Sequence, residues 1–210
     1  MLPRTDLPFV IKICGITDKE SSRLAIEAGA NALGFNFYSK SPRYLPAKVA
    51  REIIEAVPGN YLRVGVFVNP SLEELMRTVE DAQLDVVQLH GNRCPSVPSL
   101  RVWRAVAPSE IPERTEVEAC LLDTPMNGIG GSGHTFDWKL AAHRPFRVII
   151  AGGLDARNVA DAIATALPWG VDACSRIESQ PGKKDHTKVR DFVHAAREAF
   201  HVRLQQEISI

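Results

Sequence analysis

The sequence has no surplus of charge of either sign. Its 25 lysine and arginine residues are balanced by 25 aspartate and glutamate residues, so the formal net charge is zero. Proteins that bind nucleic acid or an anionic membrane surface usually carry an excess of basic residues. We therefore expect neither nucleic acid nor a membrane as a partner, although the balance is compatible with a local positive pocket for a small anionic ligand.

Long hydrophobic runs are also absent. No segment approaches the ~20 consecutive apolar residues that a membrane-spanning helix needs. The first residues, Met1–Pro8, contain two prolines and no long apolar stretch, so no signal peptide is visible. The expectation from these absences is a cytoplasmic protein.

Cysteine is scarce and dispersed. None of the four cysteines belongs to a CxxC pair, and the six histidines do not occur at metal-ligand spacing. The dispersed pattern favours free thiols over disulfides, and no metal site is expected. The cysteines are Cys14, Cys94, Cys120 and Cys174.

Eight short apolar runs are present along the 210 residues. Most are continuous stretches of valine, isoleucine, leucine and phenylalanine, which is typical of parallel strands that are buried on both faces. The length suits one large domain, so we expect residues 1–210 to form a single unit. The predicted strands are Phe9–Ile13, Ala32–Phe37, Arg63–Val68, Asp85–Leu89, Val102–Val106, Ala119–Leu122, Arg147–Ala151 and Gly170–Cys174.

Helical patterns alternate with these runs. Capping-box sequences at Thr17–Glu20 and Ser71–Glu74 mark two helix starts, because a hydroxyl and a glutamate can satisfy free helix N–H groups. The helices after strands four, five and six are expected to be short or missing. Further helices are predicted over Ala47–Ala56, Leu72–Asp81, Ala156–Leu167 and Thr187–Phe200.

This alternation predicts an α/β protein with a closed (β/α)8 TIM barrel. The alternative is an open, doubly wound sheet. That fold usually has a glycine-rich phosphate loop after its first strand, and the segment Cys14–Thr17 is not such a loop. The barrel is therefore the favoured fold.

Functional residues of such barrels gather at the C-terminal ends of the strands. There, Cys14 and Asp123 end two buried runs and could act as an acid/base pair across a cavity. Glycines after strand seven let the backbone approach a phosphate closely. The candidates at these ends are Cys14, Asn36, Arg43, Gln88, His90, Asp123, Gly152, Gly153, Cys174, Ser175 and Arg176.

Several of these positions have competing interpretations. Arg43 follows a proline and could bind a carboxylate or phosphate, or could be an ordinary surface arginine. His90 is expected to form hydrogen bonds within the barrel mouth rather than to bind a metal. The glycine cluster Gly130–Gly133 could be a lid over the site or a plain surface turn.

Lys12 and Asp172 each lie two residues before a cysteine and so share its strand face. Strands one and eight are neighbours in a closed barrel, and an unpaired buried charge is costly. We expect an interior ion pair between the two side chains. The ammonium group should also favour the thiolate form of Cys14.

Seven motifs, in order along nearly the whole chain, resemble those of the phosphoribosylanthranilate isomerase family. They are Lys12–Thr17, Phe37–Tyr44, Gln88–Gly91, Leu122–Asp123, Gly130–Gly133 with Phe136–Trp138, Ala151–Leu154 and Pro181–Asp185. The resemblance implies a (β/α)8 isomerase of tryptophan biosynthesis. Such an enzyme converts N-(5'-phosphoribosyl)anthranilate to 1-(2-carboxyphenylamino)-1-deoxyribulose 5-phosphate, an Amadori rearrangement that needs no metal or organic cofactor.

The resemblance also implies roles. Asp123 would be the general acid and Cys14 the general base, so the pKa of Asp123 should be raised and that of Cys14 lowered. Arg43 would bind the anthranilate carboxylate. The phosphorylated substrate would be held further by Gly152, Gly153, Ser175, Arg176, Gln88 and His90.

One departure from the family pattern follows strand eight. The family usually reads Ser-Ser-Gly-Val-Glu there, whereas this chain has Cys174-Ser175-Arg176-Ile177-Glu178. Arg176 could contact the phosphate or point to solvent.

Two other functions are weighed against the isomerase. A metal-dependent pentose-phosphate epimerase would need several inward histidines and aspartates. A catalytically silent sugar-phosphate-binding barrel is the main alternative, and retention of both Cys14 and Asp123 argues against it. Monomer and homodimer both remain open.

Overall fold

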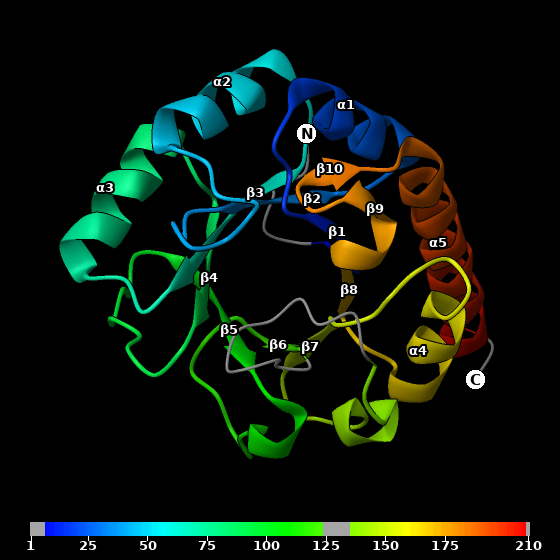
Figure 1. Ribbon diagram of the computed structural model, residues 1–210. Helices are drawn as coiled ribbons and strands as arrows, with labels where there is room; N and C mark the ends of the chain where they lie inside the picture. Colours follow the sequence, from blue (N-terminus) through cyan, green and yellow to red (C-terminus); the bar gives the residue numbers. More distant parts are fainter. Residues whose placement is uncertain (1–6, 124–134, 209–210) are drawn as a thin grey trace.

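Eight parallel strands close into a barrel in the computed structural model, which describes residues 7–123 and 135–208 (Figure 1). Each strand pairs with the next along the chain, and β8 pairs with β1. The predicted barrel is confirmed, and the open sheet is excluded. The strands are β1 Val10–Cys14, β2 Ala32–Asn36, β3 Leu62–Val68, β4 Val86–His90, β5 Arg101–Val106, β6 Ala119–Leu122, β7 Arg147–Ile150 and β8 Gly170–Ala173.

The helices lie around the outside of the barrel, but unevenly (Figure 1). No α-helix separates β4 from β5, and only the 3-10 turns η1 and η2 follow β5 and β6 in the described chain, as predicted. Their bounds are Pro108–Glu110 and Trp138–Ala141. The α-helices are α1 Lys19–Ala28, α2 Ala47–Ala56, α3 Leu72–Ala82, α4 Val159–Ala166 and α5 His186–Ile208.

The N-terminal caps of α1 and α3 confirm one of the two predicted capping residues and correct the other. Ser71 caps α3, accepting a hydrogen bond from the backbone N–H of Glu74 at 3.1 Å. The cap of α1 is Asp18 rather than Thr17, because the Asp18 carboxylate accepts from the N–H of Ser21 at 2.7 Å. The Thr17 hydroxyl instead donates to the carbonyl of Gly182. Both caps satisfy helix N–H groups that would otherwise lack partners.

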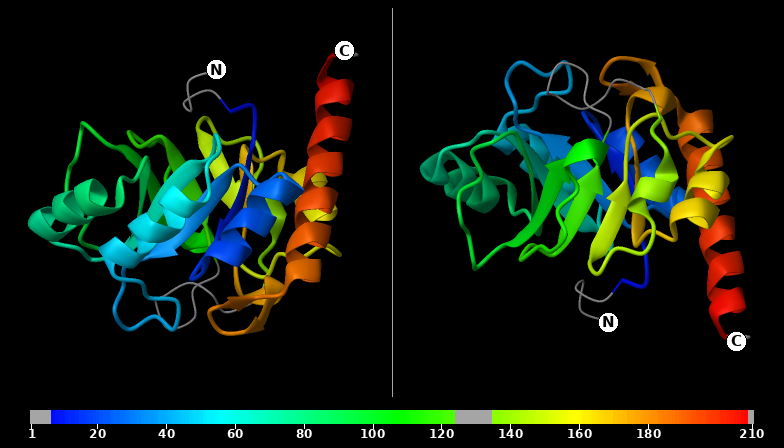
Figure 2. Two further views of the ribbon diagram at one scale, coloured as in Figure 1. Left: turned by 90° about the horizontal axis from the view of Figure 1, so that it is seen from above. Right: turned by 90° about the horizontal axis from the view of Figure 1, so that it is seen from below.

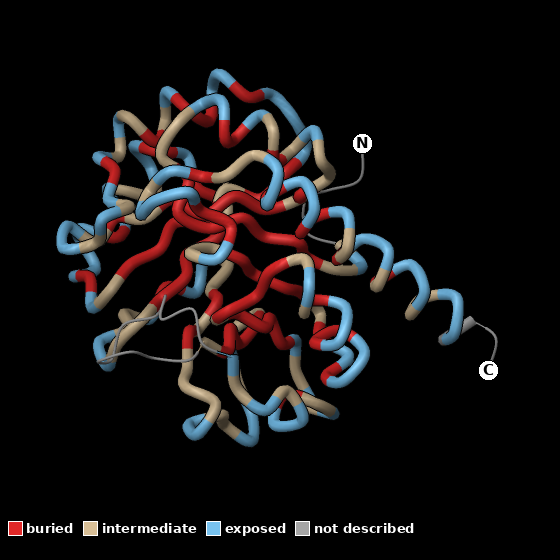
Figure 3. Tube along the Cα trace, turned by 45° about the vertical axis from the view of Figure 1, so that its right-hand side comes forward, coloured by how far each residue is buried: buried red, intermediate tan, exposed pale blue. Residues whose placement is uncertain are grey.

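The last helix runs further than its sequence pattern indicated. It was expected to end at Phe200, but α5 continues to Ile208 and projects beyond the barrel body (Figures 2 and 3). A short antiparallel pair that the sequence did not reveal precedes it, formed by β9 (Glu178–Gln180) and β10 (Lys183–Lys184). None of the helices in the described chain combines the length and apolar character that a membrane span requires.

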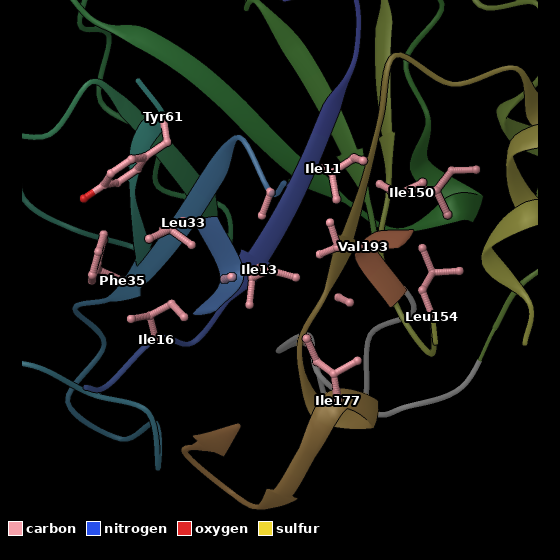
Figure 4. Packing of buried hydrophobic residues seen from close by; sticks show 14 of the residues in the cluster. Ile11, Ile13, Ile16, Leu33, Phe35, Tyr61, Ile150, Leu154, Ile177 and Val193 are labelled. Carbon is pink, nitrogen blue, oxygen red and sulfur yellow. The ribbon is translucent and has the colours of Figure 1, made fainter. Parts of the chain in front are cut away.

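The core has two layers because successive strand residues point to opposite faces of the sheet. Outward residues pack against the helices, and Figure 4 shows Ile11 and Ile13 of β1, Leu33 of β2 and Val193 of α5 in this layer. The inward residues fill the barrel interior, as they do in other closed barrels. They include Val10, Ala32, Leu62, Val64, Val86, Trp103, Ala119, Leu121, Ile149 and Ala151.

This alternation also determines which side chains face the barrel mouth. Continuing the inward series by two residues from Leu121 reaches Asp123, and from Val10 it reaches Lys12 and then Cys14. Thus the side chains at the C-terminal strand ends face one space, and chemistry-bearing residues far apart in sequence converge there.

Candidate active site

A cavity of about 250 Å³ opens at the C-terminal end of the barrel. Every residue proposed for the site on sequence grounds lines it, which is the arrangement that parallel barrel strands impose. Polar groups are contributed by Cys14, Asn36, Arg43, Gln88, His90, Asp123, Gly152, Gly153, Asp172, Cys174, Ser175 and Arg176.

Cys14 is the last residue of β1 and is buried, with only 8% of its surface exposed. Its strand neighbour in β2 is Gly34. A Cβ atom at Gly34 would lie 2.8 Å from Cys14 Sγ, a distance that side chains do not tolerate. The glycine therefore leaves the room that the thiol occupies.

Lys12 and Asp172 form the predicted interior ion pair. Lys12 Nζ lies 3.0 Å from Asp172 Oδ2, and both side chains are buried. Burial opposes a charged ammonium, yet the charges of Asp172 and Cys14 raise the pKa of Lys12 overall. Burial raises the pKa of Asp172 to about 7 against the attraction of Lys12. A cation is thus fixed beneath Cys14.

The second thiol of the site is Cys174, which faces Cys14 across the β1–β8 seam and is coupled to it in titration. This bond lowers the pKa of Cys174 to about 7; burial acts against it, and the charges of Lys184 and Arg43 act with it. The pKa of Cys14 is raised, first by the bond to Cys174 and then by burial. The two thiols therefore titrate as a coupled pair in which the thiolate is favoured on Cys174.

The raised value corrects the expectation that the pKa of Cys14 lies below its ordinary range. Lys12 does lower it, as predicted, but the neighbouring thiol outweighs this effect. Sequence reasoning placed Cys174 at a strand end without recognising that it would meet Cys14.

Arg43 is held by a residue that the sequence analysis assigned no role. Its Nε and Nη2 atoms donate to the two carboxylate oxygens of Glu178 at 2.9 and 2.6 Å. Lys184 Nζ lies 2.9 Å from the same carboxylate. This bidentate pairing fixes the guanidinium at the cavity wall and leaves its Nη1 group outside the fork. Arg43 is thus not a freely solvated surface arginine.

Gln88 and His90 form a neutral pair on β4. Gln88 Nε2 lies 2.8 Å from His90 Nε2, so His90 forms the expected hydrogen bond in the barrel mouth. Burial, followed by the charges of Lys12 and Arg104, lowers the pKa of His90 to about 4. Within the described residues, Gln88 Oε1 is buried and has no hydrogen-bond partner, which makes it a candidate contact for a ligand.

The loops after β7 and β8 meet through Arg176. Gly152 and Gly153 have φ angles of 81° and 64°, which favour glycine. Arg176 needs no such angle, because it lies in the 3-10 turn η3 (Ser175–Ile177). Its Nη1 atom lies 3.0 Å from Asp155 Oδ2. The arginine thus ties the two loops together, an arrangement that neither sequence-based alternative foresaw.

Asp123 follows β6 directly and lines the cavity. The strand β6 lies across the barrel from β1 and β2 (Figure 1). The predicted lid Gly130–Gly133 lies outside the described residues. Phe136 and Trp138, beyond it, pack partly buried against the outer core. Among residues 7–123 and 135–208, no group of three or more histidine, cysteine or acidic side chains is arranged to hold a metal ion.

A closed (β/α)8 barrel with thiols, a carboxyl group and fixed cations around one cavity defines an enzyme of the TIM-barrel class. A family model described as "N-(5'phosphoribosyl)anthranilate (PRA) isomerase" matches residues 11–195. The chain belongs to this family of isomerases.

Individual relatives agree with this placement. The N-(5'-phosphoribosyl)anthranilate isomerase of Solibacter usitatus is 49% identical, over 91% of this chain and 98% of the relative. The crystal structure of the Thermotoga maritima isomerase is 37% identical, with a TM-score of 0.81 over 90% of this chain and 99% of that one. A second crystal structure is that of a phosphoribosyl anthranilate isomerase in complex with reduced 1-(o-carboxyphenylamino)-1-deoxyribulose 5-phosphate. It is 34% identical, with a TM-score of 0.78 over 90% of this chain and 99% of that one.

Proposed function

We propose that the mouth cavity is the active site in which this isomerase converts N-(5'-phosphoribosyl)anthranilate to 1-(2-carboxyphenylamino)-1-deoxyribulose 5-phosphate, a step of tryptophan biosynthesis. The observation that carries the proposal is the placement of Cys14 on β1 and Asp123 after β6, both in the wall of one cavity. Acid and base on opposite rigid supports suit proton transfer to and from a sugar between them. A biosynthetic role of this kind also fits a cytoplasmic location.

Proton transfers by Asp123 and Cys14 drive the reaction, and a tautomerisation completes it. Asp123 donates a proton to the furanose ring oxygen, the bond from that oxygen to C1' breaks, and an imine forms. Cys14 removes the proton from C2', which gives an enolamine. The enolamine then tautomerises to the ketone product: C1' gains a proton and the C2' hydroxyl loses one, so that the proton taken up by Cys14 balances the one given by Asp123. Substrate and product are isomers, so the chemistry consumes no oxidant or reductant.

The thiol pair supplies the base. At rest the shared proton is on Cys14, because the surroundings favour the thiolate on Cys174. Transfer of that proton to the neighbouring Cys174 thiolate frees Cys14 to accept the C2' proton. Lys12 stabilises the Cys14 thiolate during this step.

Binding follows from the charges and backbone around the cavity. The Nη1 side of Arg43 faces the anthranilate carboxylate in this proposal, since Glu178 holds the rest of its guanidinium. Gly152, Gly153 and Ser175 take the phosphate, and Arg176 adds positive charge beside it. Gln88 and His90 contribute neutral hydrogen-bonding groups. The phosphorylated ligand in the related crystal structure supports a site of this kind.

The test is an isomerase assay on freshly generated phosphoribosylanthranilate. Cys14→Ala and Asp123→Asn should each reduce kcat by about 10²–10⁴-fold, the usual contribution of a general acid or base, with a smaller change in KM. Cys94→Ala and Asp137→Asn are matched controls outside the cavity and should keep normal turnover. Undiminished turnover in both cavity variants would reject the assigned roles. Binding without turnover by the unmutated protein would favour the silent sugar-phosphate binder.

A further inference from the structure

The two active-site thiols meet across the seam where the barrel closes. Cys14 ends β1, and Cys174 directly follows β8. The register pairs Ile13 with Ala173, so the next position on each strand brings the two cysteines opposite one another on the same face. The two thiols are close enough for each to shift the pKa of the other, which is raised at Cys14 and lowered at Cys174. A Cβ atom at Gly15 would lie 3.1 Å from Cys174 Sγ, which shows how closely this sulfur covers the end of β1.

This spacing suits a disulfide. Neighbouring strands lie about 4.8 Å apart, and disulfides join Cα atoms separated by roughly 4.4–6.8 Å. The two sulfurs must come to about 2 Å from one another to bond covalently, and side-chain rotation can bring them together.

The surroundings of Cys174 favour its reactive form. Lys184 Nζ lies 3.9 Å from Cys174 Sγ and 3.2 Å from its backbone carbonyl oxygen. Arg43 is the second cation near this sulfur, and Glu178 is the only carboxylate that pairs with both in the described chain. The local excess of positive charge stabilises a thiolate, which is the form that reacts with oxidants. Cys174 also lines the cavity, so small molecules can reach it.

We propose that Cys14 and Cys174 are a redox-modification site, at which a peroxide oxidises the two thiols to a disulfide across the β1–β8 seam. The Cys174 thiolate attacks hydrogen peroxide, which forms a sulfenic acid and releases hydroxide. The Cys14 thiol then attacks the sulfenic sulfur, which forms the disulfide and releases water. The two sulfurs lose two electrons in total, and the peroxide takes them up. A dithiol reductant reverses the change by thiol–disulfide exchange.

The consequence for activity rests on the proposed function. A sulfur held in a disulfide cannot accept the C2' proton, so the oxidised protein would be an inactive isomerase. Family members with serine in place of Cys174 would lack this response, because a hydroxyl forms no disulfide. The site is thus a property of this chain's departure from the family pattern.

The other two cysteines provide internal controls. Cys94 Sγ lies 3.8 Å from the carbonyl oxygen of Gly91, and Cys120 is hydrogen-bonded to Thr115. Cys120 is fully buried, and burial raises the pKa of its thiol. One cation, Arg104, acts on Cys120, whereas Lys184 and Arg43 both act on Cys174, and Cys94 contacts a neutral carbonyl. Both control thiols should therefore react with peroxide more slowly.

The experiment treats the reduced full-length protein with hydrogen peroxide, blocks remaining thiols by alkylation and maps tryptic peptides by mass spectrometry. The expected result is a cross-link between the peptides Ile13–Lys19 and Asn158–Arg176, which dithiothreitol removes. Isomerase activity should fall at least fivefold with peroxide and return with dithiothreitol. Separate oxidation of Cys14 and Cys174 without a cross-link, or a cross-link between Cys94 and Cys120 instead, would overturn the proposal.

Cys174→Ser is the informative variant. Its activity after oxidation is compared with the activity of its own reduced form. It should form no cross-link, and peroxide should inactivate it at least fivefold more slowly than the unmutated protein. Equal inactivation rates would contradict the proposal. The mass readout stands apart from catalysis: a reversible cross-link that leaves turnover unchanged would support the redox site and reject Cys14 as the base.

Discussion

The two sides of the barrel mouth solve the problem of buried polar groups differently. On the β8–β1 side, charges are paired: Lys12 with Asp172, and Glu178 with both Arg43 and Lys184. On the β4 side, Gln88 and His90 meet through a hydrogen bond, and the histidine is kept neutral. One side therefore sets an electric field, whereas the other supplies donors and acceptors without charge.

This difference matches the demands of the two thiols. A thiolate needs nearby cations, and the charged side has three of them, Lys12, Arg43 and Lys184, for two carboxylates. A charged histidine on the β4 side would place another cation in the same cavity and would require solvation that burial removes. The arrangement predicts that variants on the charged side shift thiol chemistry, and that those on the neutral side shift acid stability.

The largest effect is expected from Glu178→Gln, which breaks the charged side. Glu178 is 8% exposed and is the shared partner of two cations, so its loss leaves buried positive charge uncompensated. Removing one partner of a buried pair typically costs about 3–5 kcal/mol. Urea unfolding at pH 7 should show a loss of this size.

The matched control for that variant is Glu118→Gln. Glu118 makes a similar bidentate pair with Arg101, but the two side chains are 19% and 21% exposed. We expect a smaller loss of about 1–2 kcal/mol, because water can solvate the guanidinium of Arg101 that loses its partner. Equal losses at the two positions would show that burial does not distinguish the charged side of the mouth.

The neutral side is tested by acid. Burial, Lys12 and Arg104 lower the folded-state pKa of His90 from 6.5 to about 4. Between these values the unfolded chain binds the proton and the folded chain does not, so stability is lost as the pH falls from 6.5 toward 4. The loss due to His90 should be about 3 kcal/mol, since one pKa unit corresponds to about 1.4 kcal/mol.

The measurement compares unfolding free energies of the unmutated protein and His90→Gln at pH 7, 6, 5 and 4.5. The variant should lose less stability over this range, because glutamine has no proton to bind. Parallel curves for the two proteins would show that His90 is protonated equally in the folded and unfolded chains. NMR titration of the His90 ring provides a direct check of its neutral state.

The sequence predicted the features that follow from regular strands and barrel closure better than those that depend on short or irregular segments. The eight strands were recognisable because most are continuous apolar runs, and each predicted end lies within one residue of the observed end. Closure of the barrel then brings every C-terminal strand end to one mouth, so Cys14, His90 and Asp123 could be placed together without coordinates. The Lys12–Asp172 pair was predictable for the same reason, since β1 and β8 must be neighbours.

The interactions that were missed depend on short or irregular segments. Glu178 reaches Arg43 because the chain folds back in a hairpin of three- and two-residue strands, which are too short for a hydrophobic pattern to reveal. The contact of Arg176 with Asp155 depends on the conformation of two loops. Likewise Thr17 and Asp18 are both good capping residues, and only the local backbone decides between them.

A subtler change on the charged side is Lys12→Met. Removing this cation should raise the apparent pKa of the thiol pair by about one unit, because a nearby opposite charge favours the thiolate. Asp172, left without its partner, should remain neutral, since burial already raises its pKa. The rate of iodoacetamide alkylation as a function of pH reports the shift. Lys139→Met, on η2, is the control, and an unchanged profile for Lys12→Met would remove its role in activating the thiols.

The smallest effect is expected where the charged side reaches solvent, at Asp155. Burial opposes its ionisation, but bonds from Arg157 and Arg176 lower its pKa from 3.8 to about 2. The carboxylate therefore contributes stability above pH 4, and this contribution is lost as the pH falls toward 2. Because the partners are partly or largely exposed, we expect Asp155→Asn to cost only about 1 kcal/mol at pH 7.

Two further variants separate stability from binding at this edge. The Arg157 side chain is 84% exposed and forms an ion pair with Asp155 outside the cavity. Arg176, in contrast, joins the loops after β7 and β8 and lines the cavity. Arg176→Gln should therefore raise KM for the phosphorylated substrate severalfold, and Arg157→Gln should leave it within twofold of the unmutated value. If both variants changed KM alike, the loop connection through Arg176 would have no special part in binding. Among the cations of the charged side, only Arg43 and Lys184 would then remain as candidates for contact with the substrate.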